Sequence, residues 1–281
     1  MINKKHRTLK YTSFLLSILI LLLAFSQHVD VKANPDSLTE LSKKWTTFEI
    51  PPEPTATPPE TNAEGTYPIE SEPHQEGQTS KAVYLTFDDG PDPKWTPQIL
   101  NLLKIYNAKA TFYMLGRNVA SYPELIVELA QAGQSLANHS YNHPSFNDLS
   151  HDAISREVGN TNWVTRNALV NHPELESQVV PCVRPPYGDA NGGVYNALWG
   201  LGYSVSMWDL DTQDWRQPPP ASILQQVLGS VETHRVILMH DGGEQRKATV
   251  DSLALILHEL TIQGYSFEPY CTQNGQVSIS P

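Results

Sequence analysis

The sequence has few cysteines, no excess of positive charge and no hydrophobic run long enough to span a bilayer. Two cysteines in 281 residues, Cys182 and Cys271, cannot form a disulfide-rich scaffold, and they lack the C-x-x-C spacing of a zinc ribbon or a redox pair. Lys and Arg number 19 against 30 Asp and Glu, a net charge of −11. Because nucleic acid would repel such a chain, we expect no nucleic-acid partner.

The N-terminus has the layout of a secretory signal. Four Lys and Arg residues precede an apolar run of 12 residues from Phe14 to Phe25, and Val31-Lys32-Ala33 has small residues where a signal peptidase cleaves. A spanning helix needs about 20 residues. We therefore expect residues 1–33 to be a cleaved signal peptide and the protein to be secreted or held in the cell envelope. If this segment is not cleaved, it is the one expected membrane anchor.

Residues 34–80 are rich in Pro and Glu and poor in large apolar side chains. Such a segment cannot bury enough surface to offset its ordering entropy, which predicts a disordered linker. It is either a spacer that holds a catalytic domain away from a membrane or wall, or a leader without that role.

From Lys81 onward, short β-branched runs alternate with amphipathic stretches, a pattern typical of βα units and a parallel sheet. The expected strands are Val83–Phe87, Thr111–Leu115, Ser135–Asn138, Val183–Pro185, Tyr203–Trp208, Val236–Met239 and Tyr265–Pro269. The expected helices are Pro97–Tyr106, Glu124–Ala132, Ile154–Leu169, Val194–Leu201 and Val250–Gln263. About seven parallel strands, one short of the usual eight, predict an α/β domain that is a distorted or incomplete (β/α) barrel. No Gly-rich phosphate loop follows the first strand, so no nucleotide cofactor is indicated.

Polar residues follow the expected strands, and in a parallel barrel these strand ends converge on one mouth. The residues are Asp88, Asp89, His139, His143, Arg184, Tyr187, Asp211, Asp214, His240 and Asp241.

The spacing of His139 and His143 suggests a metal site. Histidines four apart lie on one face of a helical turn, so two imidazoles can reach one cation. A carboxylate from the Asp88-Asp89 pair would complete a three-ligand site with an open position. Zinc or another divalent transition metal suits these ligands, whereas calcium prefers oxygen. Taken alone, the histidine pair is as consistent with surface packing, and the two aspartates with a helix-capping turn.

Other residues suit acid and base chemistry at the same mouth. Arg184 could clamp one aspartate, or it could form a rim salt bridge. His240 is a candidate general acid that Asp214 would orient. The Tyr187 amide, fixed by the preceding Pro185-Pro186, could donate to an oxyanion. Trp215 and Leu238 could line an apolar pocket or pack in the core.

The chain resembles the polysaccharide deacetylases of carbohydrate esterase family 4, the NodB-homology domain, over about residues 81–270. Five motifs occur in order: Thr86-Phe87-Asp88-Asp89-Gly90-Pro91, His139-Ser140-Tyr141-Asn142-His143, Arg184-Pro185-Pro186-Tyr187-Gly188, Asp211-Thr212-Gln213-Asp214-Trp215 and Leu238-Met239-His240. Every position that the family uses for chemistry is matched.

The resemblance implies the role of each matched residue. Asp89, His139 and His143 would bind zinc, cobalt or another divalent metal. Asp88 would be the base that activates a metal-bound water, Arg184 would hold Asp88, and His240 would be the acid tuned by Asp214. The Tyr187 amide would stabilise the oxyanion, with Trp215 and Leu238 around the acetyl methyl group. The implied reaction removes N-acetyl groups from a polysaccharide or oligosaccharide that contains N-acetylglucosamine.

Two alternatives remain open at this stage. One is an O-acetyl esterase of the xylan type, and the other is a carbohydrate-binding pseudoenzyme. Peptidoglycan or another envelope glycan is the expected substrate, and a monomer is the expected state. We expect no disulfide, because Cys182 should lie near the start of its strand and Cys271 past the end of another, which separates them along the barrel axis.

Overall fold

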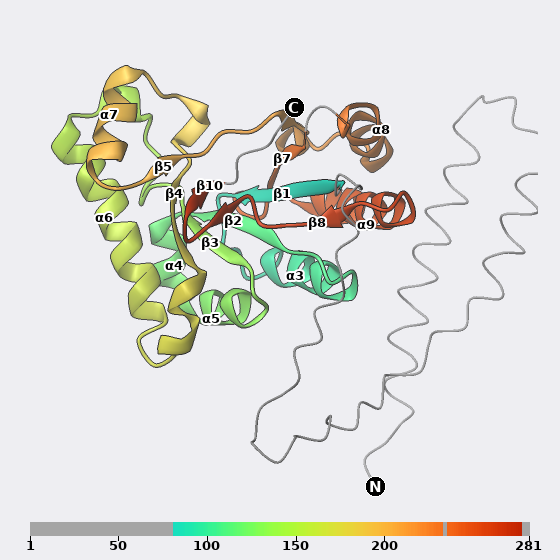
Figure 1. The fold of residues 1–281 in the computed structure, drawn as a ribbon, viewed down its shortest axis with the longest axis horizontal. Coiled ribbons are helices and arrows are strands. Elements are labelled where there is room, and N and C mark those ends of the chain that lie inside the picture. Colours follow the sequence, from blue (N-terminus) through green and yellow to red (C-terminus); the bar gives the residue numbers. More distant parts are fainter. Residues whose placement is uncertain (1–80, 233–234, 277–281) are drawn as a thin grey trace, which may run out of the picture. The chain divides into compact units, whose positions relative to one another are not determined.

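The computed structural model describes residues 81–232 and 235–276 (Figure 1). The chain divides into two units, Met1–His74 and Gln75–Pro281, and the described residues all belong to the second. The expected signal peptide (1–33) and linker (34–80) lie outside the described residues. Within the described part of the chain, no helix is long and apolar enough to cross a membrane.

Strands and helices alternate through the described residues as the sequence predicts. The first half contains β1 (Ala82–Asp88), α3 (Thr96–Ile105), β2 (Ala110–Met114), α4 (Gly116–Ser121), α5 (Pro123–Gln131), β3 (Ser135–Asn138), η1 (Phe146–Asp148) and α6 (His151–Ala168). The second half contains η2 (Pro173–Gln178), β4 (Val179–Val183), η3 (Pro186–Gly188), α7 (Gly192–Gly200), β5 (Ser204–Val205), β6 (Leu210–Asp211), η4 (Asp214–Arg216), α8 (Pro220–Ser230), β7 (Val236–His240), α9 (Lys247–Ile262), β8 (Ser266–Phe267), β9 (Cys271–Thr272) and β10 (Gly275–Gln276).

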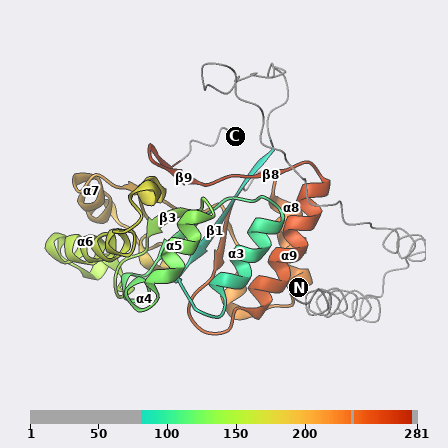
Figure 2. The ribbon, with the colours of Figure 1, turned by 90° about the horizontal axis from the view of Figure 1, so that it is seen from below.

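The sheet is a distorted, incomplete (β/α) barrel, which confirms the predicted fold class. Its strands follow the order β5-β4-β3-β2-β1-β7-β6, every described pair along it is parallel, and β8 also pairs with the start of β1. Helices α6 and α7 lie beside the β4–β5 edge, and α8 and α9 lie near β7 (Figure 1). Helices α3, α5 and α9 lie along one side of the sheet (Figure 2).

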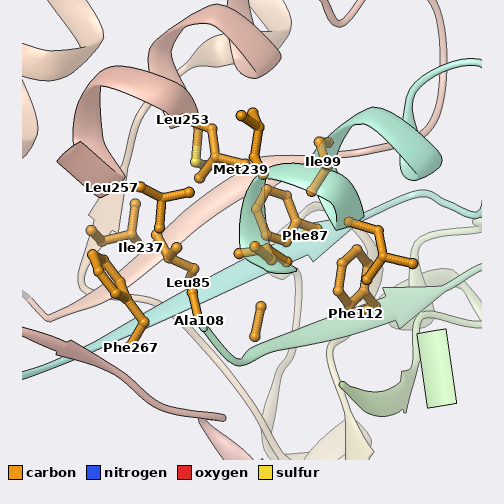
Figure 3. Packing of buried hydrophobic residues seen from close by; sticks show 14 of the residues in the cluster. Leu85, Phe87, Ile99, Ala108, Phe112, Ile237, Met239, Leu253, Leu257 and Phe267 are labelled. Carbon is orange, nitrogen blue, oxygen red and sulfur yellow. The ribbon is translucent and has the colours of Figure 1, made fainter. Parts of the chain in front are cut away.

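The main hydrophobic core lies between the sheet and the helices outside it. Side chains alternate along a strand, so Leu85 and Phe87 of β1 point outward with Ile237 and Met239 of β7. There they pack with residues of α3 and α9 such as Leu253 (Figure 3). The alternate residues of β1 face the barrel interior, where Ala82 and Tyr84 belong to a smaller hydrophobic cluster and Thr86 and Asp88 place polar groups toward the carboxyl end of the strand.

Two expected strands differ from the structure around the barrel opening. The strand expected at Val183–Pro185 is β4, Val179–Val183, and its register against β3 shifts between Leu136 and Asn138. Pro181 lies in this irregular segment, as is usual for a proline inside a sheet. The strand expected at Tyr203–Trp208 is only partly correct, because β5 covers Ser204–Val205 alone. The residues after β5 cross the gap to β6, which was not predicted and lies at the opposite edge of the sheet. Helices α4 and α8 were not predicted.

The expectation of no disulfide is wrong, because Cys182 and Cys271 form a disulfide with a Cα separation of 6.4 Å, which is within the usual range. Cys182 lies near the end of β4, not its start. After β8 the chain crosses to β4 instead of continuing along the barrel axis, and the Cys271 N–H donates to Thr111 Oγ1 of the intervening β2 at 3.1 Å. The disulfide lies in a buried cluster with Tyr113, Ala137 and Val180.

We predict that reducing this disulfide lowers the free energy of unfolding by about 2–5 kcal/mol, since it closes a long loop. Urea unfolding of the wild-type protein with and without reductant measures the change. A Cys182→Ala/Cys271→Ala double variant is the control, because its midpoint should not respond to reductant. An unchanged wild-type midpoint after complete reduction would contradict the prediction.

Candidate active site

Asp89, His139 and His143 meet at the carboxyl ends of β1 and β3. Their ligand atoms all lie within 4.8 Å of one another. Asp89 Oδ1 lies 3.4 Å from His143 Nε2 and 3.7 Å from His139 Nε2. The two histidines belong to a loop and not to a helical turn, so the expected helical geometry is wrong although the side chains converge. The backbone of His143 achieves this convergence with φ of 68°.

The electrostatics of this cluster fit a bound cation. The Nδ1–H of His139 donates to the Arg184 carbonyl oxygen at 2.7 Å, which leaves Nε2 as a lone-pair donor facing two carboxylates. Burial lowers the pKa of His139 to about 3, so this imidazole stays neutral. Asp89 Oδ1 is buried and has no hydrogen-bond partner among the described residues. Nitrogen and carboxylate ligands in this arrangement suit zinc or a similar transition metal.

Arg184 holds Asp88 from inside the barrel. Its Nη1 donates to Asp88 Oδ1 at 2.7 Å and to Thr86 Oγ1 at 2.9 Å. The other donors reach the Ser206 and Met207 carbonyls at 3.4 and 3.1 Å, in the gap between β5 and β6. Burial raises the pKa of Asp88 above its ordinary value, although the Arg184 charge opposes this shift. The pair provides a fixed carboxylate next to the metal ligands, because Asp88 Oδ2 lies 3.6 Å from His139 Nε2.

His240 and Asp214 form a second pair at the same mouth. His240 ends β7 in register with Asp88 on the neighbouring β1. Its Nδ1–H donates to Asp214 Oδ1 at 2.8 Å, and its backbone N–H donates to Asp214 Oδ2 at 2.9 Å. Burial disfavours the charged imidazole, but the hydrogen bond and charge of Asp214 outweigh it, so the pKa of His240 lies above its ordinary value. His240 is therefore suited to carry a proton near neutral pH.

The remaining predicted site residues lie in three different settings. Tyr187 has φ of 62°, and its exposed ring packs edge-on against His143 with ring centroids 4.5 Å apart. Trp215 is 46% exposed, with the Arg216 guanidinium 4.5 Å from its ring. Leu238 is buried in register with Thr86, on the inner face of the barrel. The Tyr187 ring thus lies beside His143, Trp215 follows Asp214 in η4, and Leu238 precedes His240 by two residues on β7.

Asp211 and Asp241, which the strand-end rule also placed at the mouth, have structural partners. Asp211 Oδ1 accepts the N–H of Gln213 at 2.8 Å within a turn. Asp241 is buried behind the Asp88-Asp89-Gly90 turn, where Oδ2 accepts the Thr96 hydroxyl at 2.5 Å. Burial raises the pKa of Asp241 to about 7. Its carboxylate lies so close to Gly90 that a Cβ there would clash, which explains the glycine.

Sequence reasoning missed two threonines that complete the hydrogen bonds of the site. Thr86 bridges Arg184 to the Ile237 carbonyl, to which it donates at 2.8 Å. Thr249, on α9, donates to Asp214 Oδ2 at 2.6 Å. Thr86 could have been noticed as a polar residue on the inner face of an otherwise apolar strand, whereas nothing in the sequence distinguishes Thr249.

Comparison with known proteins gives consistent matches. The polysaccharide deacetylase family model matches residues 75–206. A peptidoglycan-N-acetylglucosamine deacetylase of Bacillus cereus is 36% identical over 194 residues, which cover 66% of this chain and 85% of the relative. A family 4 carbohydrate esterase from Streptomyces lividans, solved with acetate, superposes with a TM-score of 0.62 at 30% identity, covering 71% of this chain and 98% of that one. A CE4 family pseudoenzyme from Bacillus anthracis superposes with a TM-score of 0.59 at 30% identity, covering 68% of this chain and 64% of that one.

We predict that Asp214→Asn lowers the pKa of His240, because it removes the negative charge that favours the imidazolium. Titration of the His240 ring protons by NMR measures this change, and the midpoint should move to lower pH. Asp211→Asn, at the end of β6 and three residues before Asp214, is a matched control and should leave the midpoint in place. Equal midpoints in wild type and Asp214→Asn would refute the assigned coupling.

Proposed function

Since this chain belongs to the polysaccharide deacetylase family of carbohydrate esterase family 4, we propose that it is a metal-dependent N-deacetylase of polymers containing N-acetylglucosamine. Peptidoglycan is the proposed substrate, with another envelope glycan as the runner-up, because the similar Bacillus cereus protein is named for peptidoglycan. The observation that carries the proposal is the meeting of a three-ligand cluster with a buried Asp88–Arg184 pair and a His240–Asp214 pair at one barrel mouth.

The proposed reaction cleaves the amide bond of the acetamido group with water and yields acetate and a free amine. Asp88 accepts the proton of the attacking water, and Arg184 keeps its carboxylate in place. The Tyr187 N–H donates to the acetyl oxygen as negative charge develops there. His240 donates its proton to the leaving nitrogen. A divalent ion held by Asp89, His139 and His143 would supply Lewis acidity, lowering the pKa of water and stabilising negative charge on oxygen.

We place Trp215 and Leu238 around the acetyl methyl group. Leu238 lies on the inner face at the level of Thr86, below His240, and Trp215 is partly exposed beside Asp214. Apolar surface at this position gives the methyl group a small apolar pocket and favours an acetyl group over a larger acyl group.

We propose that the protein acts outside the cytoplasmic membrane. Residues 1–33 serve as a secretory signal, or as an anchor where cleavage does not occur, and residues 34–80 serve as a linker to the deacetylase domain at 81–281. The disulfide between Cys182 and Cys271 supports this location, because such bonds persist in oxidising, extracytoplasmic compartments.

The direct test is acetate release from peptidoglycan, an N-acetylglucosamine oligomer and acetylxylan, each with and without a chelator. We expect release from the first two that stops with the chelator and returns with added zinc or cobalt. Release from acetylxylan alone would favour an O-acetyl esterase. Metal-independent binding without release from any polymer would favour a carbohydrate-binding pseudoenzyme.

The role of Asp88 as a base and the role of His143 as a metal ligand can be tested separately. We predict that Asp88→Asn lowers the turnover number by at least about 100-fold and leaves bound metal largely in place, because Asp88 is not in the ligand cluster. His143→Ala should lose both metal and turnover. Metal content by elemental analysis and acetate release measure the two effects. Equal metal loss in both variants would contradict these assignments.

A further inference from the structure

The loop that carries both histidines of the proposed metal site has an unusual backbone. Ser140 has φ of 72° and His143 has φ of 68°, a region that residues other than glycine seldom occupy. Such conformations persist when surrounding contacts fix them, and they cluster at functional sites. Some of these contacts are local, since Asn138 Oδ1 accepts the Ser140 N–H and Ser140 Oγ accepts the His143 N–H, each at 2.9 Å.

The middle of this loop is held from α6 by Glu157. Its Oε2 accepts the backbone N–H groups of Tyr141 and Asn142, each at 2.8 Å, and its Oε1 accepts the Asn142 side-chain amide at 2.9 Å. Both carboxylate oxygens are therefore engaged by the loop. Glu157 lies 14 residues after His143 in the sequence, and it belongs to none of the five motifs.

The opposite side of the loop is held by the start of α4. The Gly116 N–H donates to the Ser140 carbonyl at 3.0 Å, and the Arg117 N–H donates to the Tyr141 carbonyl at 3.2 Å. The loop is thus clamped, with carbonyls bonded to α4 and N–H groups bonded to Glu157 of α6. Without the carboxylate, two N–H donors lose their partner while the carbonyls stay anchored, so the two peptide planes between the histidines are held from one side only.

We propose that Glu157 is a positioning residue for the metal site, setting the separation and direction of His139 Nε2 and His143 Nε2 without touching either ring. The inference rests on the proposed function, since it takes these histidines as ligands. Outer hydrogen bonds made directly to metal ligands are worth about 10–100-fold in metal affinity, and we take that range as the scale for a contact that acts through the loop backbone. In this proposal Glu157 raises metal affinity because its side chain is long enough to place two acceptor oxygens against the loop, and not because it is negatively charged.

Three variants and a control separate reach from charge. Glu157→Ala removes the acceptors, and Glu157→Asp keeps the charge on a side chain one methylene shorter. Glu157→Gln keeps an oxygen for the two N–H groups, while the Asn142 amide can turn to accept from the new NH₂ group. Arg156→Ala changes an exposed neighbour on the same helix and is the matched control.

The measurement is cobalt(II) binding to the intact protein, with the dissociation constant from chelator competition and the ligand geometry from the visible absorption spectrum. We expect Glu157→Ala and Glu157→Asp to weaken binding by about 10–100-fold and to alter the spectrum. The Glu157→Gln variant and the Arg156→Ala control should bind as wild type does. Thermal unfolding is followed in parallel, because a merely structural role would change the melting temperature and leave the spectrum of the folded protein alone.

Each outcome decides the proposal. Wild-type affinity and spectrum in folded Glu157→Ala would overturn it, and if that variant does not fold, the same result in Glu157→Asp would do so. If Glu157→Gln binds cobalt as weakly as Glu157→Ala does, the claim that the position of the acceptor oxygens matters and not the negative charge is overturned. If the wild-type protein itself binds neither cobalt nor zinc, the proposed metal-dependent function fails and this inference fails with it.

Discussion

The site depends on the interaction between the buried guanidinium of Arg184 and the carboxylate of Asp88. A charge removed from water costs several kcal/mol unless it is paired and fully hydrogen-bonded. Arg184 satisfies this requirement with Asp88, Thr86 and the carbonyls of Ser206 and Met207, while the Tyr113 ring lies 4.0 Å from its guanidinium. Those carbonyls belong to the segment that crosses the opening between β5 and β6. The side chain that closes the barrel therefore also fixes the proposed base.

Neighbouring aspartates acquire different roles because each faces a different partner. Asp88 is the last residue of β1, so strand alternation directs its side chain inward to Arg184. Asp89 has φ of 72°, and its carboxylate lies beside the two histidines of the loop after β3. Asp88 is thus satisfied by a fixed cation of the protein. Asp89 faces the ring nitrogens of two histidines, an arrangement that an added cation stabilises.

Several residues at the barrel mouth share a strained backbone. Positive φ angles occur at Asp89, Ser140, His143 and Tyr187, all of them at or between groups of the proposed site. Strain of this kind persists because the rest of the domain fixes it. Here the sheet and its outer helices supply a close-packed core, and hydrogen bonds from that scaffold, including those of Glu157, hold the loops. Stability resides in the core, and precise placement resides in the loops.

The sequence by itself determined most of the strand and helix order, the barrel class and the residues that follow most strands, because hydrophobic periodicity and turn residues are local properties. It also identified Asp89, His139 and His143 as a set, through motifs typical of one family. Only the tertiary structure decided the break between β5 and β6, the Cys182–Cys271 disulfide and the non-helical histidine loop. Each of these depends on segments far apart in the sequence, whose approach is governed by how the incomplete barrel packs and not by any local pattern.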